Sequence, residues 1–316
     1  MKLLILGYSR IVQKRVLPAL ARLKVSSVDL ASRTKASQVV WPGGLTGQSF
    51  ADYDQALARS QAELVYVSTV NSGHAYWAEK ALKSGRHVIV DKPASLGFKE
   101  AERLVGLAEK AGLCLAEATT YAYHPQIEAI RQAFSQAGTR PTRLAAFFSF
   151  PPLSSGDFRY QKALGGGALW DTGAYAVSPG RIFFEAEPIE VWGRIIERAG
   201  EVESAYSLAF VYPEGHSMVG HFGFTTAYRN RLEVFGPQLS AELDRVFTIP
   251  AEMENEIRLI ERDQPRTVKV PPADCFALFF EEVFESVASG HCKALAQNIL
   301  FDAFVLDRLR QACGLD

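Results

Sequence analysis

The sequence predicts an α/β protein in which a doubly wound parallel sheet is followed by an α+β domain with a largely antiparallel sheet. In the first half, buried β-forming runs alternate with amphipathic segments such as Phe98–Ala111, which is typical of βαβ units. From Thr142 onward, strand patterns follow one another directly, which indicates antiparallel pairing. The length of 316 residues agrees with two domains of about 150 residues each, and we expect them at 1–119 and 120–316.

Composition argues against several classes of protein. The formal net charge is only -1, so no overall charge attracts nucleic acid or an anionic membrane. No uninterrupted run of about 18 apolar residues occurs, so no membrane span is expected. The four cysteines are widely spaced, as in reduced proteins, and we expect a cytoplasmic location.

The stretch His87–Pro93, HVIVDKP, organises the first half. Its three consecutive apolar β-formers predict a strand buried on both faces, as in the centre of a parallel sheet. Pro93 lacks an amide hydrogen and ends this strand. Asp91 and Lys92 therefore fall at the carboxyl end of a central strand, where open α/β sheets bind ligands. The alternative is a lysine on an ordinary loop.

The N-terminus indicates a dinucleotide-binding turn. The apolar run Leu3–Leu6 meets Gly7, and a helical pattern covers Ile11–Leu23. Of the three glycines in the usual fingerprint only Gly7 is present. Ser9 is small and can bind phosphate, whereas Val12 must pack where a small residue normally lies. A plain β-turn-α unit explains the segment about as well.

The second predicted strand, Val28–Ala31, ends in Ser32-Arg33-Thr34-Lys35. An acidic residue at this position would bind a ribose 2′-hydroxyl, whereas a hydroxyl and basic groups suit a 2′-phosphate. The sequence therefore favours NADP, with NAD as the alternative. Solvated basic side chains would give the same pattern.

Polar residues also follow the third predicted strand, Leu64–Ser68. Thr69, Asn71 and His74 come between this strand and a helix, where they are placed to face a cofactor. His74 could equally be a capping residue.

In the second half, five strands and two closing helices are predicted. The strands are Leu144–Phe150, Glu190–Glu197, Ser204–Tyr212, Ser217–Phe224 and Arg231–Phe235, and the helices are Asp274–Ala288 and Ala294–Cys313. Gly165-Gly166-Gly167 leads into a further helix, Ala168–Phe184.

Several motifs in order resemble the Gfo/Idh/MocA oxidoreductases. Asp91-Lys92-Pro93 is similar to the Glu-Lys-Pro of that family, and Val70–His74 to its Pro-Asn-x-x-His without the proline. Glu117–Gln126 and Leu164–Tyr175 (LGGGALWDTGAY) extend the resemblance over about 1–185. The resemblance implies a Rossmann domain, hydride transfer with a nicotinamide cofactor, a sugar-type substrate, and a homo-oligomer (dimer or tetramer).

The residues expected to contact the cofactor lie at the strand ends of the first half. They are Gly7, Ser9, Arg10, Ile11, Ser32, Arg33, Ser68, Thr69, Asn71, His74, Asp91 and Lys92.

Three residues are expected to carry the chemistry: Lys92, Asp171 and Tyr175. Asp171 and Tyr175 are four apart and share one helix face. Hydride transfer to a ketone leaves an alkoxide that needs a proton, and a neighbouring ammonium makes a phenol a better acid-base group. We expect Tyr175 to donate and accept the proton, Lys92 to tune it and bind the oxygen, and Asp171 to orient it. A local Asp171–Tyr175 hydrogen bond of purely structural value is the alternative.

Other candidate substrate contacts are His124, Arg159, Tyr160 and Trp170, with a capping or interdomain role equally open for His124. Arg229-Asn230-Arg231 could bind an anion, although an exposed strand end explains it more simply. No metal site is expected, because no histidine pair with ligand spacing occurs.

Two prolines fall inside predicted helices. Pro18 should bend its helix, and Pro179 removes the hydrogen bond to the Tyr175 carbonyl, so we expect a bend or break there.

These observations lead to an NAD(P)-dependent oxidoreductase acting on a hydroxyl or keto group of a sugar or sugar derivative, including a nucleotide sugar. The alternative is a non-catalytic or regulatory protein that binds a dinucleotide or sugar on the same scaffold. Leu208, Phe210 and Tyr212 are candidates for an oligomer face, unless they belong to the core.

Overall fold

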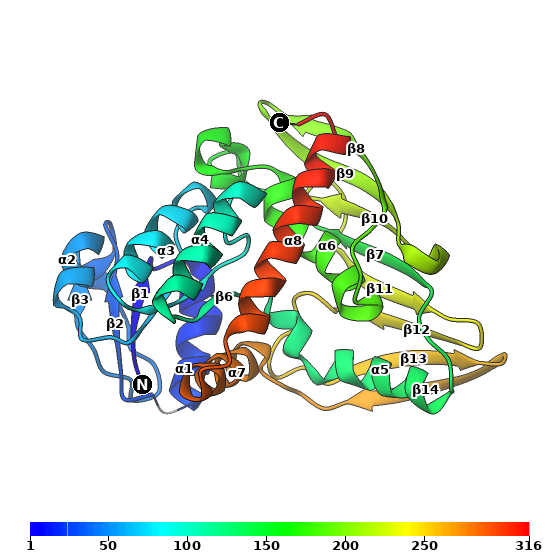
Figure 1. The fold of residues 1–316 in the computed structure, drawn as a ribbon, viewed down its shortest axis with the longest axis horizontal. Coiled ribbons are helices and arrows are strands. Elements are labelled where there is room, and N and C mark those ends of the chain that lie inside the picture. The colour runs from blue at the N-terminus through cyan, green and yellow to red at the C-terminus, as the bar shows by residue number, and fades with distance from the viewer. Residues whose placement is uncertain (24, 316) are drawn as a thin grey trace. The chain divides into compact units, whose positions relative to one another are not determined.

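The computed structural model describes residues 1–23 and 25–315, which form two compact units (Figure 1). The first contains Met1–Thr119 and Phe276–Ala303, and the second contains Thr120–Cys275 and Phe304–Asp316. The chain crosses from the first unit to the second between Thr119 and Thr120. The chain also returns to the first unit at Phe276. The two expected domains, with one boundary between them, did not include this second crossing.

The first unit is built on a parallel sheet of six strands in the order β3-β2-β1-β4-β5-β6. This order, with its crossover after β1, confirms the predicted doubly wound fold. The strands are β1 (Lys2–Leu6), β2 (Ser27–Ala31), β3 (Ser49–Phe50), β4 (Leu64–Val67), β5 (His87–Val90) and β6 (Leu115–Glu117). Val88, Ile89 and Val90 of β5 are all 0% exposed, as expected for a strand covered on both faces.

The helices of this unit are α1 (Leu17–Arg22), α2 (Tyr53–Arg59), α3 (His74–Lys83), α4 (Phe98–Ala111) and α7 (Cys275–Ser289). A π-helical segment, Val12–Val16, precedes α1, and Pro18 lies in the first turn of α1. Residues 10–22 are helical without interruption, so Pro18 lies inside this helix and removes one backbone hydrogen bond. The π-helical segment ends two residues before it.

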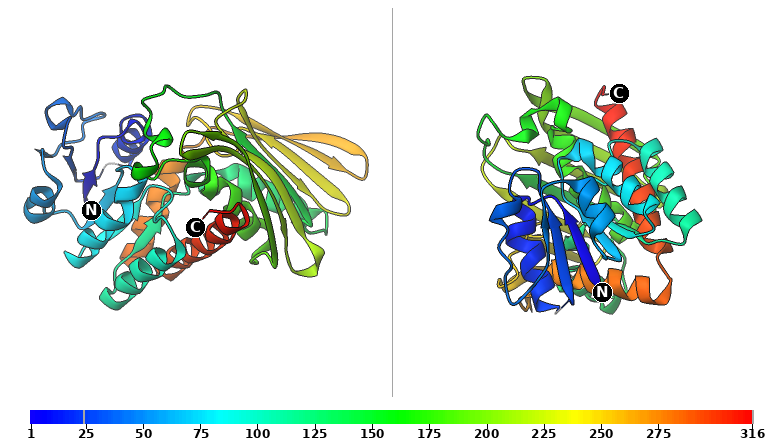
Figure 2. Two further views of the ribbon diagram at one scale, coloured as in Figure 1. Left: turned by 90° about the horizontal axis from the view of Figure 1, so that it is seen from above. Right: turned by 90° about the vertical axis from the view of Figure 1, so that its left-hand side faces the viewer.

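The second unit contains an eight-stranded sheet, visibly twisted in Figure 2, in the order β14-β13-β12-β11-β7-β10-β9-β8. Every neighbouring pair is antiparallel except β7–β10. Its strands are β7 (Arg143–Ser149), β8 (Glu190–Ala199), β9 (Val202–Val211), β10 (Ser217–Gly223), β11 (Arg229–Phe235), β12 (Leu239–Asp244), β13 (Asn255–Glu261) and β14 (Gln264–Val270). The largely antiparallel prediction is confirmed, but β12 to β14 were missed.

Two helices lie wholly in the second unit, α5 (Pro125–Gln136) and α6 (Ala168–Phe184), and α8 (Lys293–Ala312) runs from the first unit into the second. Helix α6 packs on β7, β9 and β10. Leu208, Phe210 and Tyr212 are at most 2% exposed, so they belong to the core and not to an oligomer face.

Helix α6 continues without interruption through Pro179. The predicted break is therefore wrong, and the predicted bend stays a prediction. Proline removes one backbone hydrogen bond, but the residues around it are held by other contacts. Ser178 donates from its hydroxyl to the Ala174 carbonyl, and its Oγ lies 2.7 Å from the Tyr121 hydroxyl.

None of the helices in 1–23 and 25–315 has the length and apolar character needed to cross a bilayer.

Candidate active site

The turn after β1 requires glycine. Gly7 has φ +112°, and a Cβ at this position would lie 2.0 Å from the Ser68 carbonyl oxygen. Any side chain would therefore collide with the end of β4. The Gly7 amide donates to the Ala31 carbonyl at 2.9 Å, so this turn joins the ends of β1, β2 and β4. The buried Gly7 turn therefore packs against the end of β4 at the carboxyl edge of the sheet, the edge at which folds of this type bind a dinucleotide.

Ser9 replaces the second fingerprint glycine with a useful hydroxyl. Its Oγ accepts a hydrogen bond from the Val12 amide at 3.1 Å and lies 2.8 Å from the Ser68 Oγ. It thus caps the helix and ties it to β4. Val12 is completely buried, while Arg10 and Ile11 are exposed in the first turn. The turn after β1 is therefore closely packed, although Ser9 and Val12 replace two of its usual glycines.

Asp91 is anchored to β4. Its two carboxylate oxygens accept hydrogen bonds from the Tyr66 hydroxyl and the Ser68 hydroxyl. The Asp91 amide also donates to the Val67 carbonyl at 2.9 Å. Asp91 therefore fixes the start of the segment that carries Lys92. The sequence did not predict that Tyr66 would help to hold Asp91.

His74 and Glu117 fix the end of the same segment. The His74 ring is 1% exposed, with Nδ1 2.8 Å from the Pro93 carbonyl oxygen and Nε2 3.1 Å from the Thr69 carbonyl oxygen. Burial lowers the pKa of His74, and the Asp91 carboxylate partly offsets this. Glu117 accepts from the Ala94 amide at 2.7 Å. The backbone on either side of half-buried Lys92 is thus held in place, and each His74 ring nitrogen faces a backbone carbonyl, one of which accepts the single N–H of the neutral ring.

Arg33 lies beyond the end of β2, and its guanidinium packs on two aromatic rings. Its guanidinium carbon is 4.8 Å from the Tyr53 ring centroid and 5.5 Å from that of Trp77. Such cation–π contacts hold the exposed guanidinium in place. The Ser32 hydroxyl accepts from the Lys35 amide at 3.2 Å. No acidic side chain occurs between Ser32 and Lys35, which suits a 2′-phosphate.

In the second unit, the buried carboxylate of Glu203 caps the start of α6. Gly167 has φ +115°, and a Cβ there would lie 2.4 Å from the Glu203 Oε1. This oxygen accepts from the Leu169 amide at 3.1 Å, so Glu203 of β9 caps the helix. Burial raises the pKa of Glu203. The sequence predicted that the glycines lead into a helix, but it did not indicate that Glu203 caps this helix.

Buried Asp171 forms an ion pair with half-buried Arg159. The Arg159 Nε lies 2.8 Å from the Asp171 Oδ2, and its Nη1 lies 3.3 Å from the Asp157 Oδ1. Burial alone would lower the pKa of Arg159, but Asp171 and Asp157 more than offset it, and the pKa is raised. The structure therefore brings these two predicted site residues together.

Tyr175 lies in a cluster of aromatic rings. Its ring centroid is 5.0 Å from that of Phe148, 5.1 Å from Phe247 and 5.9 Å from Tyr121. The contacts with Phe148 and Tyr121 are edge-to-face and the Phe247 ring is tilted, so aromatic rings pack closely around Tyr175. Tyr175 is half-buried, so its position is fixed while part of it stays accessible.

The remaining predicted substrate residues have local partners. The Trp170 ring lies 3.9 Å below the Arg310 guanidinium carbon, and it is 9% exposed. The Tyr160 hydroxyl accepts from the Leu153 amide at 3.0 Å. His124 is the N-cap of α5 and accepts from the Gln126 amide at 3.2 Å, so the capping alternative describes it.

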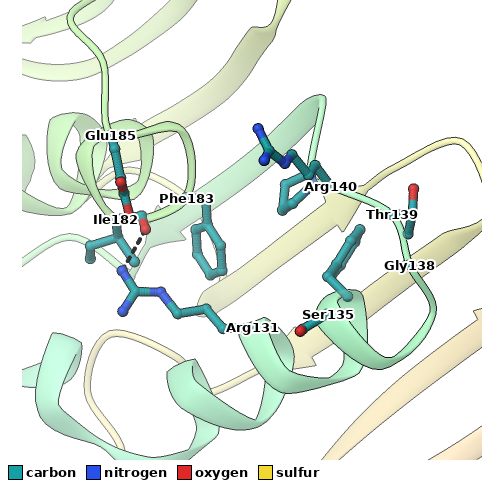
Figure 3. A pocket seen from close by; sticks show the side chains of 10 residues that line it. Arg131, Ser135, Gly138, Thr139, Arg140, Ile182, Phe183 and Glu185 are labelled. Atoms are coloured by element: carbon teal, nitrogen blue, oxygen red, sulfur yellow. Dashed lines mark hydrogen bonds between the residues drawn. The ribbon is translucent and has the colours of Figure 1, made fainter.

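A pocket of about 410 Å³ lies between the ends of α5 and α6 (Figure 3). Arg131, Ser135, Arg140 and Glu185 are among its lining residues. The Arg131 Nη2 donates to the Ile182 carbonyl at 2.6 Å, drawn as a dashed line in Figure 3. This contact satisfies a terminal carbonyl of α6 and gives Arg131 a structural role.

The fold and the first unit define a dinucleotide-binding oxidoreductase. Residues 1–119 match the family described as "Oxidoreductase family, NAD-binding Rossmann fold", and residues 135–242 match the "GFO/IDH/MocA C-terminal domain". The chain belongs to the Gfo/Idh/MocA family and is an NAD(P)-dependent oxidoreductase, as the sequence predicted.

Two relatives and one solved structure illustrate the similarity. A dTDP-3,4-didehydro-2,6-dideoxy-alpha-D-glucose 3-reductase from Actinomadura kijaniata is 30% identical over 97% of this chain and 93% of its own length. A D-xylose 1-dehydrogenase (NADP(+)) from Haloferax volcanii is 27% identical over 90% of this chain and 89% of its own length. The crystal structure of a 3-ketoreductase from Actinomadura kijaniata with NADP and TDP-benzene has a TM-score of 0.91 at 28% identity, covering 99% of this chain and 98% of the other.

Proposed function

We propose that this protein uses NADPH to reduce a keto group on a nucleotide-activated sugar, or catalyses the reverse oxidation. The observation that carries the proposal is the similarity to a dTDP-sugar 3-reductase over 97% of the chain, which includes both units. The crystal structure of a 3-ketoreductase with bound NADP and TDP-benzene supports the same cofactor and substrate class.

The roles of the side chains follow from their chemistry. The bound nicotinamide supplies or accepts the hydride. Lys92, held at the end of β5, binds the substrate oxygen and stabilises its developing negative charge. Tyr175 transfers the proton at its phenol oxygen. Asp171 acts through its ion pair with Arg159, which fixes the first turns of α6 and hence the position of Tyr175.

The test is an assay of NADPH oxidation with a dTDP-linked keto sugar, compared with the same sugar lacking the nucleotide. We expect turnover with the nucleotide sugar and a much higher KM for the free sugar. Turnover of free sugars alone would contradict the nucleotide-sugar assignment.

Arg33→Ala should change cofactor preference. Loss of a charge-assisted contact to the 2′-phosphate is worth about 1.5–3 kcal/mol, so NADPH affinity should fall by roughly 10–100-fold. NADH affinity should be almost unchanged, because NADH has no 2′-phosphate. Fluorescence titration with both nucleotides measures this. Equal weakening of the two would show that Arg33 does not contact the 2′-phosphate.

We also propose a homodimer formed through the open face of the second sheet. Trp192 and Val219 are 52% and 49% exposed and flank Ala209 in neighbouring strands, so they form an apolar patch on that face. Trp192→Glu should therefore convert the dimer to a monomer in light scattering, whereas Tyr76→Glu, at an equally exposed site in the first unit, should not. A monomeric wild type would remove this proposal.

The cytoplasm is the proposed location. Cys114, Cys275, Cys292 and Cys313 are all free thiols, as is usual for proteins of a reducing compartment.

A further inference from the structure

An exposed tyrosine and arginine form a stacked pair at one end of the second sheet. The Tyr228 ring is 42% exposed, and the Arg245 guanidinium carbon lies 4.7 Å from its centroid. The Phe148 ring contacts both Tyr228, at 6.5 Å, and Tyr175, at 5.0 Å. The pair is therefore one aromatic ring away from the proposed acid-base residue.

Buried Asn230 holds this pair in place. Its Nδ2 donates to the Tyr228 hydroxyl at 3.0 Å, and its carbonyl accepts from the Arg245 amide at 2.7 Å. Its Oδ1 accepts from the Phe247 amide at 3.0 Å, and the Phe247 ring packs on Tyr175. Asn230 thus fixes Tyr228 and Phe247 through its side chain and the Arg245 backbone through its own backbone carbonyl. Arg245 also has φ +59°, a backbone conformation that is uncommon outside glycine and is often found at ligand-binding sites.

Arg245 donates from its Nη1 to the Tyr228 hydroxyl at 3.4 Å, and it has no acidic partner among residues 1–23 and 25–315. Arg231, on β11 nearby, pairs with Glu233 at 2.5 Å and with Glu242 at 2.6 Å. Across 1–23 and 25–315, no carboxylate forms an ion pair with Arg245 or with Arg229. A guanidinium that is positioned by its neighbours but left without a counter-ion is suited to bind an anion from solution.

We propose that Arg245 and Tyr228 bind the nucleoside diphosphate half of the substrate. The Arg245 guanidinium donates to the diphosphate oxygens, and the exposed Tyr228 ring packs against the nucleoside. The sugar then extends past Phe148 toward Tyr175. This inference rests on the proposed nucleotide-sugar function and assigns the part of the chain that would distinguish a nucleotide sugar from a free sugar.

The experiment compares Arg245→Gln with Arg229→Gln. Arg229, the first residue of β11, follows Tyr228 directly and is also exposed, so it is a matched arginine. Binding of dTDP to the NADP-saturated protein is measured by calorimetry, and KM and kcat are measured with a dTDP-linked keto sugar. Arg245→Gln should weaken dTDP binding about 10–100-fold and raise KM by a similar factor. Because Arg245 does not touch the reacting atoms, kcat should stay unchanged. Arg245→Lys should lie between the two, and Arg229→Gln should resemble the wild type.

Two results would overturn this inference: no dTDP binding by the wild type, or normal dTDP binding by Arg245→Gln. They are distinct from failure of the proposed function, because dTDP binding is measured without turnover. If dTDP binding depends on Arg245 but no nucleotide sugar is reduced, the subsite stands and the proposed reaction is wrong. If nucleotide sugars are reduced normally by Arg245→Gln, the reaction stands and the subsite is wrong.

Discussion

Tyr175→Phe is expected to lower kcat by about 10²–10⁴-fold, because it removes the group that we propose transfers the proton to or from the substrate oxygen. The ring contacts with Phe148, Phe247 and Tyr121 do not involve the hydroxyl, so the fold and the affinity for NADPH should be retained. Steady-state kinetics together with a fluorescence titration of NADPH separate these two effects.

Tyr206→Phe provides the control. Tyr206 is also in the second unit, and its hydroxyl lies 3.1 Å from the Thr172 Oγ1 of α6, but it is fully buried. Its loss should leave kcat close to the wild-type value. A Tyr175→Phe protein with wild-type kcat would mean that another group, or water, transfers the proton.

Lys92→Met should have an effect of similar size on kcat/KM. It removes the positive charge at the end of β5 but keeps an unbranched side chain. Removing one group that stabilises a developing oxyanion costs about 10²–10³-fold in rate. Because Asp91, His74 and Glu117 hold the backbone on either side, the segment should keep its conformation. Stopped-flow measurement of a single turnover isolates the chemical step from cofactor release.

A neutralised lysine elsewhere in the first unit controls for the change in net charge. Lys110, exposed in the last turn of α4, serves this purpose as Lys110→Met. Lys92→Arg restores the charge but not the compact ammonium, so it should recover only part of the rate. Full activity in Lys92→Met would remove Lys92 from the mechanism.

The sequence was most informative where one residue's chemistry or one regular pattern decides local structure. The helix pattern at Phe98–Ala111 agrees with α4 residue for residue, and Val88–Val90 forms a strand buried on both faces. Such segments are specified by hydrophobic periodicity alone. β3 contains only two residues, which is too short for any periodic signal. Strand β14 is mostly exposed and carries Pro265 and four charged or polar neighbours, so its pattern is weak.

Candidate site residues were easier to find than their partners. Lys92 and Tyr175 were singled out from motifs, but the groups that hold them come from distant parts of the chain. Glu203 is 34 positions from Leu169, whose amide it caps, and Tyr66 is 25 positions from Asp91. Nothing local in the sequence specifies these contacts, because they form only when elements distant in the sequence pack together. Likewise, His74 and Trp170 have polar or aromatic character suited to ligand binding, yet tertiary packing gives each a partner within the protein.

We propose above all that Lys92 and Tyr175 act on the same substrate oxygen. The most direct measurement is a crystal structure of the protein with NADP and a dTDP-linked sugar bound. We predict that the Lys92 Nζ and the Tyr175 hydroxyl both lie within hydrogen-bond distance of the sugar oxygen at the carbon facing the nicotinamide. A bound sugar whose reactive oxygen is contacted by other side chains, with Lys92 or Tyr175 directed elsewhere, would contradict the account.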